Sequence, residues 1–177
     1  MRIGIDTQTT LGQKTGFGFY VKNLISNLKK IDKTNEYFFF QPNFERDLST
    51  PQRLIWDQYH IPLRANKAKV DILHQPCFSN PVFYSGKTVV TIHDLIALLY
   101  GKDIPFWSRQ YFGHWMPLTY RRANKIICDS ENTKKDVMKF LHIPEEKLRV
   151  IYLATDEEFD KEINRDQIES VKKKYLL

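Results

Sequence analysis

The sequence has few cysteines and no long apolar run, and each absence excludes a class of protein. Its two cysteines, Cys77 and Cys128, lie far apart and form no Cys-x-x-Cys pair, so no disulfide framework is predicted. His74 precedes Cys77 at a spacing that a metal could use, but the sequence contains no second pair of ligands. We therefore expect no metal site. No stretch approaches the roughly 20 apolar residues that a membrane span needs.

The amino terminus lacks an apolar leader, because Arg2 and Asp6 stand where a signal peptide would be apolar. We therefore expect the protein to stay in the cytoplasm. The GxSxG, Walker and HExxH motifs are also absent, and so is any internal repeat. Nucleophilic hydrolysis and P-loop chemistry consequently have no support in the sequence.

What is present is the composition of a globular domain. The chain has 177 residues, of which 42% are hydrophobic and 27% are charged, enough for one packed domain with a tail. Lysine and arginine number 27 against 21 acidic residues, a net charge of +6, which favours an acidic partner such as a phosphorylated substrate or an anionic lipid. Nucleic-acid binding would rest on this net charge alone, and we expect none.

One segment, residues 104–128, contains no carboxylate and mixes basic with aromatic side chains, among them Trp107, Arg109 and Trp115. Two interpretations stay open. The segment could rest on the inner face of a membrane as a peripheral contact, or it could form an amphipathic helix that packs on the sheet and leaves a basic edge in solvent.

Short apolar runs of strand length alternate with stretches of helical period, which predicts an α/β protein. The expected strands mostly lack polar alternation and are therefore covered on both faces; they are Arg2 to Asp6, Glu36 to Gln41, Val70 to His74, Lys87 to His93, Lys125 to Asp129 and Leu148 to Leu153. Helices are expected over residues 17–31, from Thr50-Pro51 onward, over 107–123 with a kink at Pro117, and after Ser130.

This order predicts a doubly wound, Rossmann-like, mostly parallel sheet with helices on both faces. Its ligand crevice should lie beyond the carboxyl ends of the strands, so function is sought in the loops that follow Asp6, His93 and Asp129. The segment TGFGFY opens the first helix, where backbone amides and the helix dipole can hold a phosphate. Its residues Gly16, Phe17 and Gly18 are candidate ligand-binding residues.

An alternative is that these glycines only let the loop turn into the helix. A dinucleotide fingerprint would place its glycines directly after the strand and an acid at the end of the second strand. Here Gly16 comes ten residues after Asp6 and no acid ends the second strand. A dinucleotide-dependent oxidoreductase is therefore disfavoured.

His93 and Asp94 stand at the carboxyl end of a buried strand and fall inside the expected crevice. A histidine there can donate to a substrate hydroxyl or to developing negative charge, so both are candidate catalytic residues. Their structural alternatives are an imidazole satisfied by loop carbonyls and an Asp94 that bonds its own backbone in a turn. Ser130 and Glu131 begin the next helix as a cap and an acid at its positive end.

Several segments in this order resemble the amino-terminal domain of a family 4 glycosyltransferase of the GT-B fold; they are TGFGFYVKNLISNL, VDILHQPCFSNP, KTVVTIHDL, RRANKIICDSENTKKDVMKFLHIPEEKLRVIYLATDEEF and VKKKYLL. The resemblance implies a hexosyltransferase type of enzyme in which two Rossmann-like domains face each other. The first would hold a saccharide or lipid-linked acceptor and the second most of a nucleotide-diphosphate sugar donor. It also implies a metal-independent, retaining transfer with no tightly bound cofactor.

Carried onto this chain, the resemblance assigns Gly16 and Gly18 to the loop near the donor diphosphate and His93 to contact with the transferred sugar. Asp94 follows that histidine as in many members. Ser130 and Glu131 match the family's serine-glutamate pair.

The chain then divides into an N-terminal domain, residues 1–160, and the start of an interdomain linker helix, residues 161–177, whose Ile168, Val171 and Tyr175 share a face. We expect the donor domain to be missing and this piece to be inactive alone. The alternative from another class is a stand-alone Rossmann-like module that binds a phosphorylated ligand without catalysis.

Overall fold

The computed structural model describes residues 1–11, 15–44, 47–155 and 165–175. In that part of the chain, six strands form one sheet in which every neighbouring pair is parallel, in the order β2-β1-β3-β4-β5-β6. The strands are β1 (Arg2–Asp6), β2 (Glu36–Phe40), β3 (Ile72–Gln75), β4 (Lys87–Ile92), β5 (Lys125–Cys128) and β6 (Leu148–Val150). The predicted Rossmann-like α/β fold is confirmed.

Two strands are shorter or later than their apolar runs predict, and the backbone explains why. Lys69 has a left-handed φ of 50° and Val70 still donates to Ala65 O of the preceding helix, so β3 begins only at Ile72. At the edge of the sheet, β6 pairs with β5 as far as Cys128↔Val150, and Ile151 N still donates to Cys128 O at 2.9 Å. Tyr152 and Leu153, the rest of the apolar run, follow the strand and are exposed.

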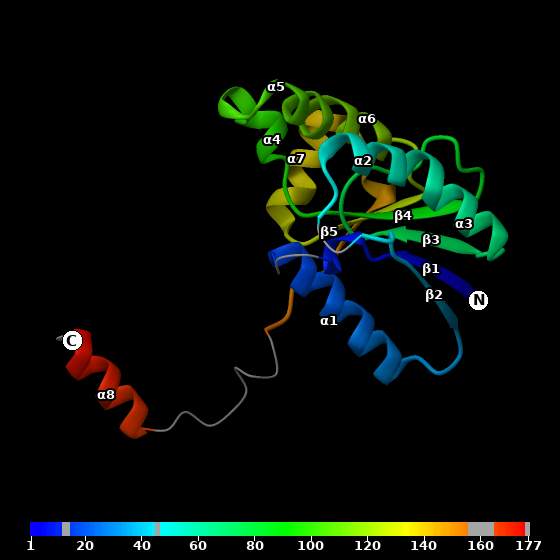
Figure 1. Cartoon of the computed structure of the whole chain (residues 1–177). Helices are drawn as coiled ribbons and strands as arrows, with labels where there is room; N and C mark the ends of the chain where they lie inside the picture. The colour runs from blue at the N-terminus through cyan, green and yellow to red at the C-terminus, as the bar shows by residue number, and fades with distance from the viewer. Residues whose placement is uncertain (12–14, 45–46, 156–164, 176–177) are drawn as a thin grey trace.

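Helices connect these strands and bury them. They are α1 (Gly16–Ile31), α2 (Thr50–Ile55), η2 (Trp56–His60), α3 (Ile61–Lys67), α4 (Ile96–Leu99), α5 (Phe106–Ser108), η4 (Arg109–Trp115), α6 (Met116–Tyr120), α7 (Glu131–Leu141) and α8 (Arg165–Tyr175), with short 3₁₀ turns η1 (Gln8–Thr10), η3 (Gly101–Asp103) and η5 (Glu145–Lys147). Figure 1 shows α1 on one face of the sheet and the helices α2 to α6 on the other.

The core divides into two apolar clusters on the sheet. One joins β4, β5 and β6 to α6 and α7 through residues such as Val90, Ile126 and Val137. The other joins β2 and β3 to the helix that runs from α2 to α3 through residues such as Leu73 and Ile61. Both clusters hold the strands rigidly, so the loops at the carboxyl ends of the strands start from fixed positions.

Two long helices each contain a π-helical segment, η2 and η4, that ends just before Pro62 and Pro117. A proline within a helix has no N–H to donate and its ring crowds the carbonyl of the preceding turn, so the turn widens. Ser49 and Gln52 form a capping box, so Ser49 is the N-cap of α2 and Thr50, not the predicted Pro51, is its first helical residue. These helices bring Asp57 and Tyr111 into contact, as described below.

The closing helix α8 lies apart from the sheet and its helices in Figure 1. Ile168 is 37% exposed and Tyr175 is 62% exposed, whereas the side chain of Val171 and the predicted boundary at residue 160 lie outside the described residues. Among the helices that the structure describes, none has the length and apolar character needed to cross a membrane.

Candidate functional site

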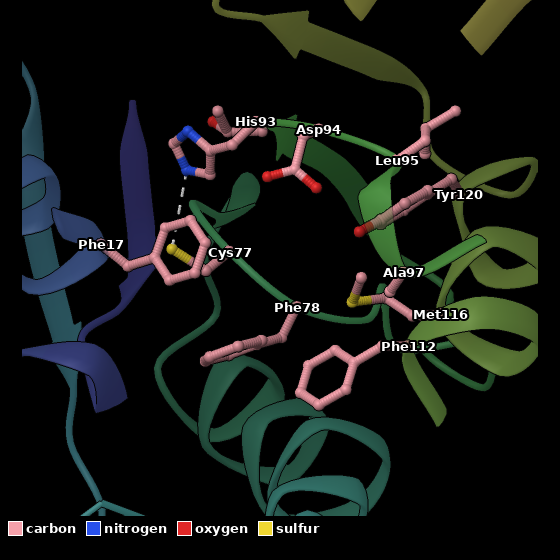
Figure 2. A pocket seen from close by; sticks show the side chains of 11 residues that line it. Phe17, Cys77, Phe78, His93, Asp94, Leu95, Ala97, Phe112, Met116 and Tyr120 are labelled. Atoms are coloured by element: carbon pink, nitrogen blue, oxygen red, sulfur yellow. Dashed lines mark hydrogen bonds between the residues drawn. The ribbon is translucent and has the colours of Figure 1, made fainter. Parts of the chain in front are cut away.

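A hollow of about 100 Å³ lies at the carboxyl edge of the sheet, where the loops after β3 and β4 meet α1. Its lining is mostly apolar and consists of Phe17, Cys77, Phe78, Thr91, His93, Asp94, Leu95, Ala97, Phe112, Met116 and Tyr120. Figure 2 shows His93 and Asp94 on one side of this space and the rings of Phe78 and Phe112 on the opposite side. A volume of this size holds a few water molecules or one edge of a sugar ring.

His93 is the best anchored of the predicted residues. It follows β4 directly, and because Ile92 pairs with Cys128 in the parallel register, the next residues, His93 and Asp129, are neighbours. His93 Nδ1 lies 3.4 Å from Asp129 Oδ2, and its side chain is 12% exposed. A carboxylate at that distance holds the imidazole in one orientation.

The other ring nitrogen also faces oxygen. His93 Nε2 lies 3.0 Å from the carbonyl of Pro76 and 3.8 Å from Cys77 Sγ, the second contact being drawn in Figure 2. This is the loop carbonyl that the structural alternative for His93 expects. Both oxygen neighbours are acceptors, so only a doubly protonated ring donates to both, and a neutral ring leaves one nitrogen for another partner.

Two aromatic side chains of α1 enclose the imidazole. The ring centroid of Phe17 lies 5.0 Å from that of His93 and the centroid of Tyr20 lies 4.8 Å from it, edge to face at 84°. Residues three apart share one face of a helix, and this face of α1 is therefore pressed against the end of β4. The phenol of Tyr20 is also 3.3 Å from Thr91 Oγ1.

Asp94 is exposed and lines the same hollow. Its Oδ1 accepts from Ile96 N at 2.9 Å, which is the turn bond that the structural alternative expects. The carboxylate nevertheless points into the space between His93 and Tyr120 in Figure 2.

The two glycines flank Phe17 in the first turn of α1 and are not part of the lining. Thr15 caps the helix, because its hydroxyl accepts from Gly18 N at 3.4 Å. A Cβ on Gly18 would lie 2.5 Å from Thr9 O, whereas a Cβ on Gly16 would meet nothing within 4 Å. Gly18 is thus required for the close approach of α1 to the loop after β1.

Ser130 and Glu131 lie at the start of α7, the helix that follows β5. Ser130 Oγ accepts from Thr133 N at 3.0 Å, which makes it the N-cap, and Glu131 is an exposed acid in the first turn. Neither lines the hollow. Thr133 Oγ1, however, lies 2.9 Å from His93 O and 3.1 Å from Asp129 Oδ1, so the cap region of α7 supports His93 from behind.

Sequence reasoning missed Asp129, Thr133 and Tyr20 as neighbours of the histidine. Asp129 was within reach, since His93 and Asp129 each follow a buried strand and neighbouring parallel strands end at one edge. Tyr20 and Thr133 were not, because their approach depends on how α1 and α7 dock against the sheet.

A buried carboxylate network beneath Cys77 was missed as well. Gln8 Nε2 donates to Asp6 Oδ2 at 2.6 Å and to Asp57 Oδ1 at 2.8 Å, and so joins the two acids. Trp56 Nε1 donates to Asp6, while Ser79 and Tyr111 hydroxyls donate to Asp57 Oδ2, each at 2.6 Å. The network ties the end of β1 to both π-helical segments.

Burial sets the protonation of the groups around the hollow. It raises the pKa of Asp6, with the charge of Asp57 as a second cause, and raises the pKa of Asp57 too. It also raises the pKa of the Cys77 thiol well above its usual range and lowers the pKa of His74 to about 4, with His93 as a second cause. Cys77 is therefore a protonated thiol at neutral pH and a poor nucleophile.

Among the described residues, no three or more His, Cys, Asp or Glu side chains gather in a way that could hold a metal ion. The group best placed to meet a charged or hydroxylated ligand is the start of α1 together with His93 and Asp94. Backbone amides at the start of a helix attract phosphate, and an imidazole can bond a sugar hydroxyl.

Comparisons with known proteins identify a family and similar solved structures. The model of Glycosyltransferase Family 4 matches residues 32–159. The chain is also similar to the crystal structure of a glycosyltransferase from Rickettsia africae ESF-5, with 17% sequence identity and a TM-score of 0.47. That similarity covers 98% of this chain and 49% of the other, so the chain spans about half of its length. No curated protein matches.

Proposed function

The chain belongs to glycosyltransferase family 4, and from this membership and its site we propose that it is the acceptor-side domain of a retaining transferase. The enzyme takes a hexose from a nucleotide-diphosphate sugar and gives it to a saccharide or a lipid-linked acceptor. A second Rossmann-like domain, completing a GT-B fold, binds most of the donor across a cleft. The reaction takes place in the cytoplasm.

The observation that carries the proposal is the meeting of Phe17, His93 and Asp94 at one hollow on the carboxyl edge of the sheet. Ligands of open parallel sheets bind at that edge. An opening of about 100 Å³ receives one edge of a sugar and leaves the rest to an opposite wall, as a reaction chamber between two domains requires.

In the proposed transfer, the bond between the sugar's anomeric carbon and the donor phosphate breaks while the acceptor oxygen bonds to the same face of that carbon. The acceptor's proton passes to the leaving phosphate oxygen. The donor itself accepts the proton, so no protein base and no metal are needed in this route. The chain's own residues then orient the sugar and stabilise charge.

His93 supplies that orientation in the proposed complex. Asp129 holds its Nδ1, and when the donor enters a sugar hydroxyl takes the place of the Pro76 carbonyl at Nε2. Asp94 Oδ2 accepts from a second hydroxyl, while its Oδ1 keeps the turn bond to Ile96 N. Amides in the first turn of α1, at Gly16 and Phe17, face the donor phosphate.

The outer surfaces of the helices that cover the sheet fit an acceptor presented at a membrane surface. Ile55, Tyr59 and Leu63 are exposed on the helix from α2 to α3, and Trp107 is 76% exposed on α5. Apolar and aromatic side chains beside lysines and arginines are typical of helices that lie in a membrane interface. We propose that this face contacts the inner leaflet when the acceptor is lipid-linked.

The test is His93→Ala in the longest open reading frame that contains this chain, assayed against a panel of nucleotide sugars. We expect turnover to fall by roughly 10- to 1,000-fold, the range for losing one positioned polar group at a reacting centre. The exposed His114 gives the matched control, since His114→Ala should leave turnover within about twofold. Equal turnover of both variants would show that the histidine does not serve the reaction.

A further inference from the structure

A second hollow, of about 440 Å³, lies at the opposite edge of the sheet, where β4 and β5 begin. In Figure 1 this is the edge at which β1 starts, near the amino terminus. Because all strands are parallel, this edge is remote from the His93 hollow. The lining is mostly polar and includes Ser85, Thr88 and Asn124.

Three cations from two segments line this hollow, which we name the basic hollow. Arg121 and Arg122 follow α6, and Lys147 ends η5. Arg121 Nε donates to Leu141 O at 3.0 Å, and Arg122 Nη1 donates to Val82 O at 3.0 Å.

The lysine is held in the same way. Lys147 Nζ donates to Arg121 O at 3.0 Å and to Ala123 O at 3.1 Å. Backbone carbonyls therefore fix all three side chains in place before any ligand arrives.

None of the three cations is neutralised in the described part of the chain. No carboxylate lines the basic hollow, and the ion pairs formed by described residues involve other arginines and lysines. Asp71 contributes to raising the pKa of Tyr84, which lines the hollow, and its Oδ2 already accepts from Arg2 N. The hollow thus carries a net positive charge.

Helix capping accounts for only part of this arrangement. Cations favour helix carboxyl ends, and Arg121 does bond the last carbonyl of α7. Yet each guanidinium uses a single N–H for its carbonyl, and a guanidinium has several more in a planar fork that matches phosphate oxygens. Those donors remain for a ligand.

We propose that the basic hollow binds a phosphate group, carried either by a small soluble molecule or by a lipid headgroup. Arg121 and Arg122 contact the phosphate oxygens, Lys147 adds charge, and the hydroxyl and amide groups of Ser85, Thr88 and Asn124 meet what the phosphate is attached to. This site is separate from the proposed transfer and does not depend on it.

Two probes distinguish the sources. Calorimetry of the 177-residue chain with inorganic pyrophosphate, at about 50 mM salt so that screening stays moderate, tests a soluble ligand. Sedimentation with phosphatidylcholine vesicles, with and without phosphatidylglycerol, tests a headgroup. We expect saturable binding in at least one arm and a loss of about 10-fold or more in Arg121→Gln/Arg122→Gln, because charge-assisted bonds are strong.

The matched control removes the same charge elsewhere. Lys22→Gln/Lys135→Gln changes two exposed lysines outside the hollow and should bind within about twofold of the unchanged protein. Equal weakening in both double variants, or no binding in either arm, overturns the proposal. If the arginine variant does not fold, the backbone amide chemical shifts of the unchanged protein, followed by NMR as pyrophosphate is added, test the proposal. Shift changes at Ser85, Thr88 and Asn124 support the site, and changes scattered over the surface contradict it.

Discussion

At the scale of single residues, the first feature is a pair of buried acids. Asp6 and Asp57 are almost fully inaccessible to solvent and are joined by Gln8, and burial raises the pKa of both. A carboxyl with a raised pKa binds its proton more tightly in the folded than in the unfolded state. Its contribution to stability is therefore lost as pH rises from its ordinary pKa, roughly 4, through the folded value.

His74 acts with the opposite sign, because burial lowers its pKa to about 4. The folded state then binds this proton less tightly than the unfolded state. The free energy of unfolding therefore rises with pH, through this group, up to the ordinary histidine pKa of about 6.5. A pH profile of the unchanged protein mixes the two effects, and only a comparison between variants separates them.

Tyr111→Phe makes that comparison. Tyr111 donates to Asp57 Oδ2 at 2.6 Å, and losing a charge-assisted bond to a buried acid should lower the free energy of unfolding by about 2 kcal/mol at pH 7.5. At pH 5 the cost should be smaller, since Asp57 is more often protonated there. Urea unfolding at both pH values measures it.

The exposed Tyr100 gives the control, because Tyr100→Phe should change stability by less than about 0.5 kcal/mol. His74 is the same in all three proteins and cancels from the difference. A Tyr111→Phe cost that is equal at the two pH values would mean that Asp57 does not titrate between them.

At the scale of elements, the packing of α1 against the loop after β1 determines which side chains lie beside His93. The helix approaches the loop after β1 so closely that a Cβ on Gly18 would lie 2.5 Å from Thr9 O. This contact places Phe17 and Tyr20 against the imidazole. A glycine that sequence reasoning assigned to a ligand thus has a packing role of its own.

Gly18→Ala should therefore destabilise the protein by about 1–3 kcal/mol, the usual cost of overpacking. Gly16→Ala is the matched control, since open space surrounds that position and alanine there should be neutral or stabilise by up to about 1 kcal/mol. Thermal unfolding of both variants checks the difference. Equal melting temperatures would show that α1 can shift away from Thr9 at no cost.

Ser130→Ala should cost about 1 kcal/mol, because Ser130 Oγ satisfies Thr133 N at the start of α7. Asn132→Ala, an exposed change in the same helical turn, should be neutral or slightly stabilising. Denaturant midpoints of the two variants give the measurement, and a Ser130→Ala midpoint at or above that of the unchanged protein would argue against the cap.

At the scale of the whole molecule, the His93 hollow is small. Sites that enclose small molecules usually measure about 300–1,000 Å³, against about 100 Å³ here. If a second domain supplies most donor contacts, as proposed, the 177-residue chain should bind nucleotide sugars more weakly than about 1 mM. Calorimetry with UDP-, GDP- and ADP-sugars tests this expectation, and micromolar binding would contradict it.

The sequence by itself determined the α/β class, the approximate places of the strands along the chain and the family, because these depend on local patterns. Buried parallel strands read as continuous apolar runs, which located β1 at Arg2–Asp6 without error. The closeness of His93 to the end of β5 follows from this pattern once the structure places β5 beside β4 in parallel register.

Only the tertiary structure decided what surrounds those strand ends. Asp57 and Tyr111 meet although 54 residues separate them, and no local pattern marks a contact made by two helices docking on one sheet. Likewise, Arg121, Arg122 and Lys147 become one basic hollow only when the starts of β5 and β6 lie side by side. Periodicity fixes which side of an element is buried, whereas the partner of a buried or tethered polar group depends on how elements pack.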